Sequence, residues 1–137
     1  DHSHKLPLKR NVLTPPGRHI PWLIFGPALR NSWEGLRVHK PGGHQDVPAT
    51  LLSAMGMQDS SFRWSKDLLD PASKPFAYLP YENYLTWISP AGWFIWNFER
   101  NTITVRSPGY RIKDDDAEAM FARAYMQTHF SDYRSIR

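Results

Sequence analysis

Cysteine is absent from the 137 residues, so the chain can hold neither a disulfide framework nor a thiolate metal site. Also missing is any apolar run long enough to cross a membrane as a helix. The sequence has no G-x-S-x-G elbow, no P-loop and no dinucleotide-binding fingerprint. Because no base is identifiably placed beside a Ser or Thr, no nucleophile stands out from the pattern alone.

A basic stripe is missing too, although the net charge is +4 and the sequence pI is near 9.5. Lys and Arg are scattered along the chain, and no glycine-aromatic RNA-binding pattern is present. A mildly basic solvated surface explains this distribution better than a nucleic-acid-binding face does. We therefore expect no nucleic-acid partner, and a failure to bind oligonucleotides at any salt concentration would exclude this class.

Aromatic side chains are abundant: the chain has six Trp, six Tyr and seven Phe, within a hydrophobic fraction of 41%. Such rings bury large areas and favour a core packed on the faces of a sheet. The length is that of one domain and is sufficient for a real core.

The first third of the chain predicts one buried strand after an irregular start. Residues 5–18 contain three Pro and one Gly without any period, which indicates a loop. Residues 22–25 are an unbroken apolar run, typical of a strand that is buried on both faces in an α/β sheet. Residues 35–40 predict a short edge strand.

Residues 44–57 predict a helix with recognisable ends. Asp46 is placed to cap its N-terminus, Pro48 lies in the first turn and Gly56 ends it. The apolar stripe expected at helical spacing comprises Val47, Leu51, Leu52 and Met55.

An antiparallel meander follows, because short aromatic and β-branched runs alternate with turn residues. Both faces of residues 93–98 are apolar, so one face is expected to pack on a helix and the other on the rest of the protein. The four predicted strands are 75–81, 84–89, 92–98 and 102–107.

The last predicted helix begins near Asp114. The acidic residues 114–116 and Glu118 suit the positive end of a helix dipole. The fold class is therefore α/β: a strand and a helix of a main sheet, then an antiparallel sheet of about four strands covered by a C-terminal helix. The expected buried face of that helix comprises Ala117, Met120, Phe121, Ala124, Tyr125 and Thr128.

The chain opens with Asp1-His2-Ser3-His4, which places three potential metal ligands in four residues. Carboxylate oxygen and imidazole nitrogen coordinate hard or borderline divalent cations. Neighbouring ligands can converge from the turn just beyond a strand, where α/β folds place their ligand sites. Two or three ligands do not complete a site, so a disordered polar terminus is the alternative.

Several stretches together resemble the C-terminal part of the sulfatase family, within the alkaline phosphatase superfamily. DHSHKLP (1–7) resembles the family's D-H-G segment, which follows a core strand and supplies metal ligands. RHIPWLIFGPAL (18–29) resembles the next strand, and HQDVPATLLSAMGM (44–57) resembles the helix with the pattern D-(I/V)-x-P/A-T-L-L. SFRWSKDLLDP (61–71) is similar to the F-x-G-x-D-L-L segment after it. The lipoteichoic-acid-synthase-like branch, with its phosphoglycerol transferases, is the most similar.

The resemblance implies that Asp1 and His2 are metal ligands, and that His4 is a substrate contact or a further ligand. The family has Gly where this chain has Ser3. It implies a divalent ion (manganese, calcium, magnesium or zinc) in the intact enzyme, which would activate a Thr, Ser or formylglycine for attack on a sulfate or phosphate ester. That nucleophile lies upstream in the family, so we expect a fragment that has no catalytic residue, is inactive alone and binds no metal alone.

The resemblance also implies an organisation and a location. Residues 1–137 would be one unit, with 1–71 ending the α/β core and 72–137 forming a C-terminal antiparallel subdomain, so that the fragment itself would be α+β. Its partners would be the missing N-terminal part of the catalytic domain and the ester substrate, and the former core surface at 22–25 would allow a dimer. The parent is expected to be membrane-anchored and extracytoplasmic, in the periplasm or at the cell surface.

A stand-alone aromatic-rich module that binds carbohydrate or protein is the competing hypothesis. It requires exposed Trp side chains that form a flat platform, and buried Trp side chains would count against it. The candidates for such a platform are Trp64, Trp87, Trp93 and Trp96.

Overall fold

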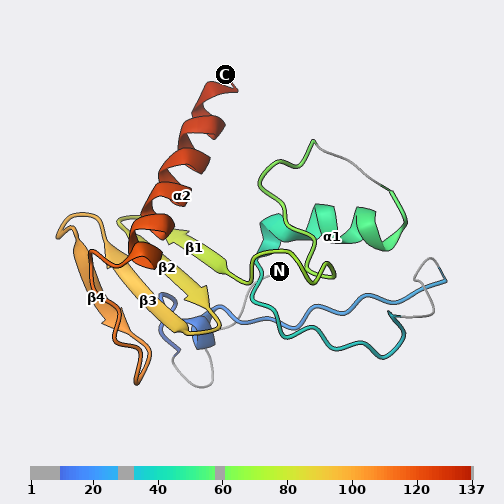
Figure 1. Cartoon of the computed structure of the whole chain (residues 1–137), viewed down its shortest axis with the longest axis horizontal. Helices are drawn as coiled ribbons and strands as arrows, with labels where there is room; N and C mark the ends of the chain where they lie inside the picture. The colour runs from blue at the N-terminus through green and yellow to red at the C-terminus, as the bar shows by residue number, and fades with distance from the viewer. Residues whose placement is uncertain (1–9, 28–32, 58–60, 137) are drawn as a thin grey trace. The chain divides into compact units, whose positions relative to one another are not determined.

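The computed structural model describes residues 10–27, 33–57 and 61–136. The chain divides into two compact units, one made of Asp1–Ile20 with Ala77–Arg137 and the other of Pro21–Phe76. The described elements are those of a mixed α/β protein, with four strands and two α-helices (Figure 1). The proposed organisation of residues 1–137 as one unit divided at residue 71 stays a prediction.

The predicted antiparallel meander is confirmed. Each strand pairs with the next in the chain, in the order β1-β2-β3-β4. Glu82 and Asn101, with φ of 45° and 50°, form the tight turns of the first and last hairpins. The strands are β1 (Ala77–Tyr81), β2 (Tyr84–Ser89), β3 (Gly92–Asn97) and β4 (Thr102–Arg106).

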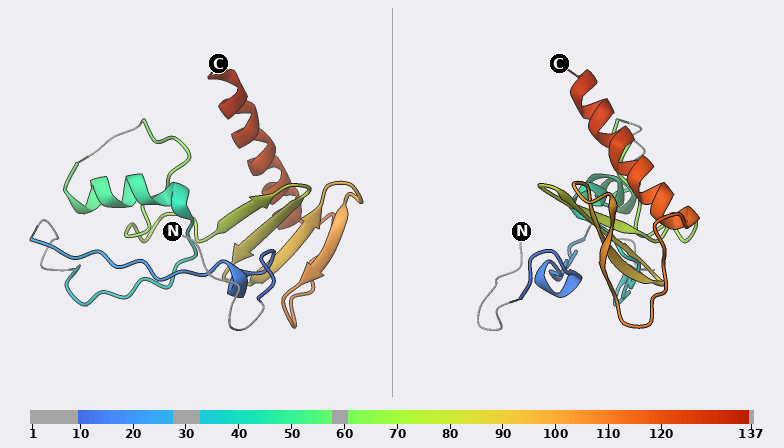
Figure 2. Two further views of the ribbon diagram at one scale, coloured as in Figure 1. Left: turned by 180° about the vertical axis from the view of Figure 1, so that it is seen from behind. Right: turned by 90° about the vertical axis from the view of Figure 1, so that its left-hand side faces the viewer.

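The sheet is covered on both faces, as the apolar pattern of residues 93–98 predicts. On one face lies helix α2 (Ala117–Ser135), where the ring of Trp87 meets that of Phe121 at a centroid distance of 5.6 Å. On the opposite face lies the segment 11–18, whose Leu13 carbonyl accepts a 2.6 Å hydrogen bond from Thr86. The right-hand view of Figure 2 shows the helix and this segment on opposite sides of the strands. The last four residues of β3, Phe94–Asn97, are therefore all buried although their side chains alternate between the two faces.

Helix α2 is present, but its predicted face is only partly the one that packs on the sheet: Phe121 and Tyr125 contact Trp87, whereas the fully buried positions are others. The helix begins at Ala117 after its N-cap residue Asp116, and its fully buried residues are Ala119 and Ala122. Met120 is half exposed instead. The reason is the size of the side chains beneath it: large Trp rings fill the sheet face, so the backbone of the helix approaches closely only where its own residues are small.

The helix predicted in the other unit is confirmed, in a shorter form. A 3₁₀ turn (η3, His44–Asp46) leads directly into α1 (Val47–Ala54). At its C-terminus Gly56, with φ of 74°, allows the amides of Gly56 and Met57 to bond back to the carbonyls of Ser53 and Leu52. The buried residues of α1 are Thr50 and Ala54, not the predicted apolar stripe, whose Met55 is 52% exposed.

The strands predicted at 22–25 and 35–40 are wrong. Neither segment is paired in a sheet, and the described residues of Pro21–Phe76 contain no β-strand. Leu23 and Phe25 are 82% and 91% exposed. A strand with two apolar faces needs neighbouring strands and covering layers, and the described part of this unit supplies neither.

In the described chain no helix is both long enough and apolar enough to span a bilayer.

Candidate functional site

The predicted metal and substrate residues Asp1, His2 and His4 lie outside the described residues. Among the residues that are described, no three His, Cys, Asp or Glu side chains gather in a way that could hold a metal ion. His39 and His44 are exposed. The only support for a metal is thus the chemistry of the carboxylate and imidazole donors at positions 1 and 2, which suits a divalent cation.

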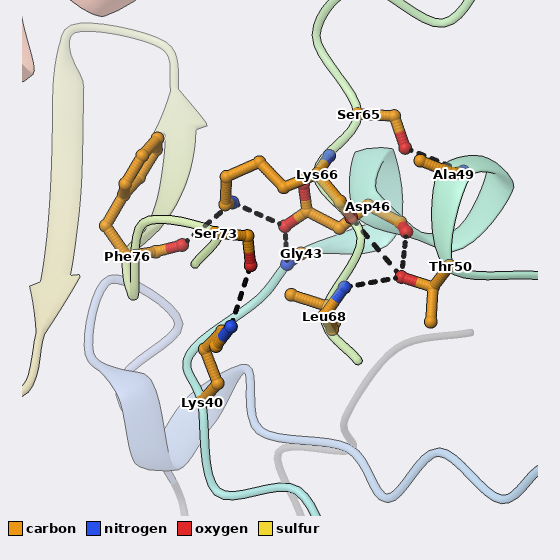
Figure 3. Close-up of polar contacts among 10 residues, drawn as sticks. All are labelled: Lys40, Gly43, Asp46, Ala49, Thr50, Ser65, Lys66, Leu68, Ser73 and Phe76. Carbon is orange, nitrogen blue, oxygen red and sulfur yellow. Dashed lines mark hydrogen bonds and ion pairs between the residues drawn. The ribbon is translucent and has the colours of Figure 1, made fainter. Parts of the chain in front are cut away.

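The best-built polar site of the described chain is a cluster around Asp46, within the unit Pro21–Phe76 (Figure 3). The side chain of Asp46 has no exposed surface. Its Oδ2 accepts hydrogen bonds from the Gly43 amide at 2.9 Å and from the Lys66 ammonium at 2.8 Å. Its Oδ1 accepts one from the Lys66 backbone amide at 3.0 Å. Both carboxylate oxygens are therefore engaged by donors from the loops before and after α1.

Lys66 is the cation that compensates this buried carboxylate. Its side chain is 14% exposed, and its ammonium also donates to the Phe76 carbonyl at 3.0 Å. The same ammonium lies 4.1 Å from the centroid of the Phe76 ring, within the range of a cation–π interaction. A buried ion pair is tolerated only when additional hydrogen bonds satisfy its remaining groups, and these contacts do so.

Thr50 extends the cluster by one helical turn. Residues four apart share a helix face, so Thr50 lies beside Asp46 and points toward the same loop. Its hydroxyl donates to the Asp46 carbonyl at 2.7 Å and accepts the Leu68 amide at 3.0 Å. Thr50 therefore holds the segment 65–68 against α1.

The N-cap prediction for Asp46 is wrong in its detail. Asp46 does precede the helix, but its carboxylate makes no capping bond to a helical amide. Ser65 provides that bond instead, because its hydroxyl oxygen accepts the Ala49 amide at 2.9 Å. The local pattern places an acceptor at the correct position in the sequence, while the acceptor that is used, Ser65, comes from a loop and lies 16 residues after Ala49 in the chain.

The chemistry of the cluster is that of a structural clasp. Every oxygen of Asp46 is occupied by donors of the protein, and the side chain is shielded from solvent, so it is not placed to exchange protons with a substrate. The cluster instead fixes the loop 65–68 and the start of α1 in one arrangement. No pattern in the sequence indicated Lys66 as the partner of Asp46.

A second polar network joins the sheet to the N-terminal half of α2. Glu118 accepts hydrogen bonds from the Trp87 indole at 3.0 Å and from the Tyr110 hydroxyl. Burial, and then the adjacent Glu118 carboxylate, raise the pKa of Tyr110 to about 12. These groups are likewise paired within the protein, and no pattern in the sequence indicated that Glu118 would pair with Trp87 and Tyr110.

The aromatic platform required by the competing hypothesis does not form from its central members. Trp87 and Trp96 are 2% and 1% exposed, beneath α2. Trp64 and Trp93 are half-buried. A sugar ring stacks on an exposed aromatic face, so the two buried Trp side chains count against this hypothesis.

No protein-family model, no curated protein and no solved structure matches the chain.

Proposed function

We propose that the chain is the C-terminal part of a metal-dependent enzyme of the sulfatase family, either a sulfuric ester hydrolase or a phosphoglycerol transferase, with an alkaline-phosphatase-like fold. The observation that carries the proposal is how the polar residues of the D-V-P-A-T-L-L stretch are placed in the structure. Asp46 and Thr50, the two polar positions that resemble the family's pattern, are both buried and both hold the loop 65–68.

The burial of side chains in the unit Pro21–Phe76 supports a larger parent enzyme. Its fully buried residues in the described chain are Asp46, Thr50, Ala54 and Phe76. Of its large apolar side chains in the described chain, Phe76 alone is buried and about half are exposed, which is unusual for a unit that folds as a complete core. These exposed side chains are Trp22, Leu23, Phe25, Leu36, Val38, Met55, Met57 and Phe62.

In this proposal Asp1 and His2 bind the divalent ion of the parent enzyme, and His4 contacts the ester or the ion. The ion would supply charge neutralisation for the transferred group and activation of the nucleophile. The described residues of this chain would have a structural role. The Asp46 cluster holds α1 and the loop 65–68 together, and the shape of this part of the enzyme depends on them. The parent would be membrane-anchored and extracytoplasmic.

The test compares the 137-residue chain with the longer protein from the same reading frame. Nitrophenyl sulfate, nitrophenyl phosphate and a fluorescent phosphatidylglycerol are offered with manganese, magnesium, calcium or zinc. We expect no turnover from the short chain, and metal-dependent turnover of one substrate by the longer protein. Turnover by the short chain alone would contradict the assignment of the nucleophile to the upstream part.

The variants Asp1→Asn and His2→Ala of the longer protein test the ligands. Each should lower bound metal, measured by elemental analysis, together with turnover. His39→Ala is the matched control, because His39 is exposed and lies outside the proposed ligand set. Full metal content in both ligand variants would overturn the proposed site.

A further inference from the structure

A cluster of aromatic rings attaches the middle of α2 to the sheet, and His129 lies at its distal end. The Trp87 ring lies 6.1 Å from that of Tyr125, and the Tyr125 ring lies 5.2 Å from that of Tyr78 in β1. His129 continues the series, with its ring centroid 5.6 Å from that of Tyr78 and 6.4 Å from that of Tyr125. The imidazole is therefore the last ring of the cluster that faces β1.

The C-terminal end of α2 extends past the strands, as Figure 1 shows. Phe130, Tyr133 and Ile136 are 46%, 66% and 83% exposed. The attachment of the last turns of α2 thus depends on contacts made near His129. One of these is the hydrogen bond between the Tyr78 hydroxyl and Nδ1 of His129.

We propose that His129 is a pH-sensitive latch, which holds the C-terminal turns of α2 against β1 while its imidazole is neutral and releases them when it is protonated. In the neutral form with the proton on Nε2, Nδ1 accepts the hydrogen bond from the Tyr78 hydroxyl. Protonation makes Nδ1 a donor, so the Tyr78 hydroxyl has to turn and accept if the hydrogen bond is to be kept. Protonation also places a cation among packed rings, and this change works against the held state.

Burial and the charge of Asp132 act in opposite directions on the pKa of His129, and burial is the larger effect. The titratable groups that face it include Tyr78 of β1 and Tyr125 and Asp132 of α2. The Asp132 carboxylate favours the imidazolium. Burial outweighs the Asp132 carboxylate and holds the pKa of His129 below its usual value of 6.5. The neutral form is thus favoured in the held state, and this stabilisation is present above pH 6.5 and is lost as the pH falls below it.

Hydrogen exchange of the full chain tests the latch. Amide protection of residues 126–135 is measured at about pH 7.5 and about pH 5.5 and is corrected for intrinsic exchange rates. We expect this segment to lose protection at the lower pH while the amides of β2 and β3 keep theirs. Equal protection of residues 126–135 at both pH values would overturn the proposal.

Two variants and one control separate the latch from general acid sensitivity. His129→Phe keeps a ring but cannot be protonated, so its segment 126–135 should be equally protected at both pH values. Asp132→Asn removes the carboxylate that favours the imidazolium, so the loss of protection should become larger. His19→Gln changes an exposed His of the same unit, and its segment 126–135 should lose as much protection at the lower pH as in the unsubstituted chain.

A loss of protection at the lower pH in His129→Phe as large as in the unsubstituted chain would overturn the proposal. If His129→Phe does not fold, NMR titration of the His129 imidazole in the unsubstituted 137-residue chain tests the proposal instead. A pKa at or above 6.5 for that imidazole would contradict a latch that favours the neutral form.

Discussion

The ammonium of Lys66 donates a 2.8 Å hydrogen bond to the carboxylate of Asp46, a side chain with no exposed surface. The two residues are 20 positions apart, one before α1 and one after it. A buried carboxylate is tolerated only when it is paired and hydrogen-bonded. This contact therefore fixes how the segment after α1 packs against the start of the helix.

Asp46→Asn should therefore destabilise the chain strongly. The change leaves the Lys66 ammonium largely buried without its counter-charge, and breaking a buried pair from one side costs about 3–5 kcal/mol. The free energy of unfolding, measured by urea denaturation, would report the loss. Glu34→Gln is the control, because Glu34 is an exposed carboxylate of the same unit, and it should change the free energy by about 0.5 kcal/mol or less.

The same pair can be tested by a double-mutant cycle. Lys66→Met combined with Asp46→Asn removes both charges, so the double variant should lose less than the sum of the two single variants. Strict additivity would mean that the two side chains do not interact in solution.

Thr50→Val keeps the shape of the side chain but removes its hydroxyl. The Leu68 amide then loses its acceptor in a place where Thr50 is 1% exposed, and an unsatisfied buried donor costs about 1–3 kcal/mol. Thr50→Ser should recover much of this loss. Thr128→Val removes an exposed hydroxyl that bonds only the Ala124 carbonyl of its own helix, and it should be almost neutral in the same urea experiment.

Asp114 should contribute stability that disappears only in strong acid. Its carboxylate accepts bonds from the Thr102 hydroxyl at 2.6 Å and the Ile103 amide at 2.8 Å, which hold its pKa below the usual 3.8. Since the folded-state pKa is the lower one, the stabilisation is present above pH 3.8 and is lost as the pH falls through the folded value. Asp114→Asn should remove this pH-dependent part of the unfolding free energy, whereas Asp115→Asn, at an exposed neighbour, should retain it.

Tyr110 should ionise well above the ordinary range of a tyrosine side chain. Its pKa is about 12, against an ordinary value of 10.0, because of burial and the Glu118 carboxylate. The neutral phenol is favoured in the folded state, so its stabilisation is complete below pH 10.0 and is lost as the pH rises toward 12. NMR titration of tyrosine ring carbons, assigned with Tyr110→Phe, would measure the shift, and Glu118→Gln should lower it. A Tyr110 that titrates near pH 10 would contradict the network.

The elements that the sequence predicts well are those that local pattern determines. The four strands are short aromatic and β-branched runs separated by turn residues, and each pairs with its neighbour in the chain. The start of α1 after Asp46 and its end at Gly56 also depend on local backbone chemistry.

The parts that could not be predicted depend on residues far apart in the chain. The stripe that includes Leu51 and Leu52 is a regular apolar pattern, yet the face that is buried carries Thr50, because a loop with suitable polar groups lies against it. Residues 22–25 have the composition of a strand, but pairing needs a partner strand that the described part of their unit does not supply. The pairing of His129 with Tyr78 spans 51 positions and has no local signal.

The hydrogen bond between Thr86 and the Leu13 carbonyl also constrains the order of events during synthesis. The two residues are separated by 73 positions, and all of Pro21–Phe76 is made between them. The segment 11–18 therefore leaves the ribosome long before the sheet face that it covers exists, and it must wait until β2 has been translated. Closing so long a loop is entropically costly, so we expect the docking of this segment to be a late and slow step of folding.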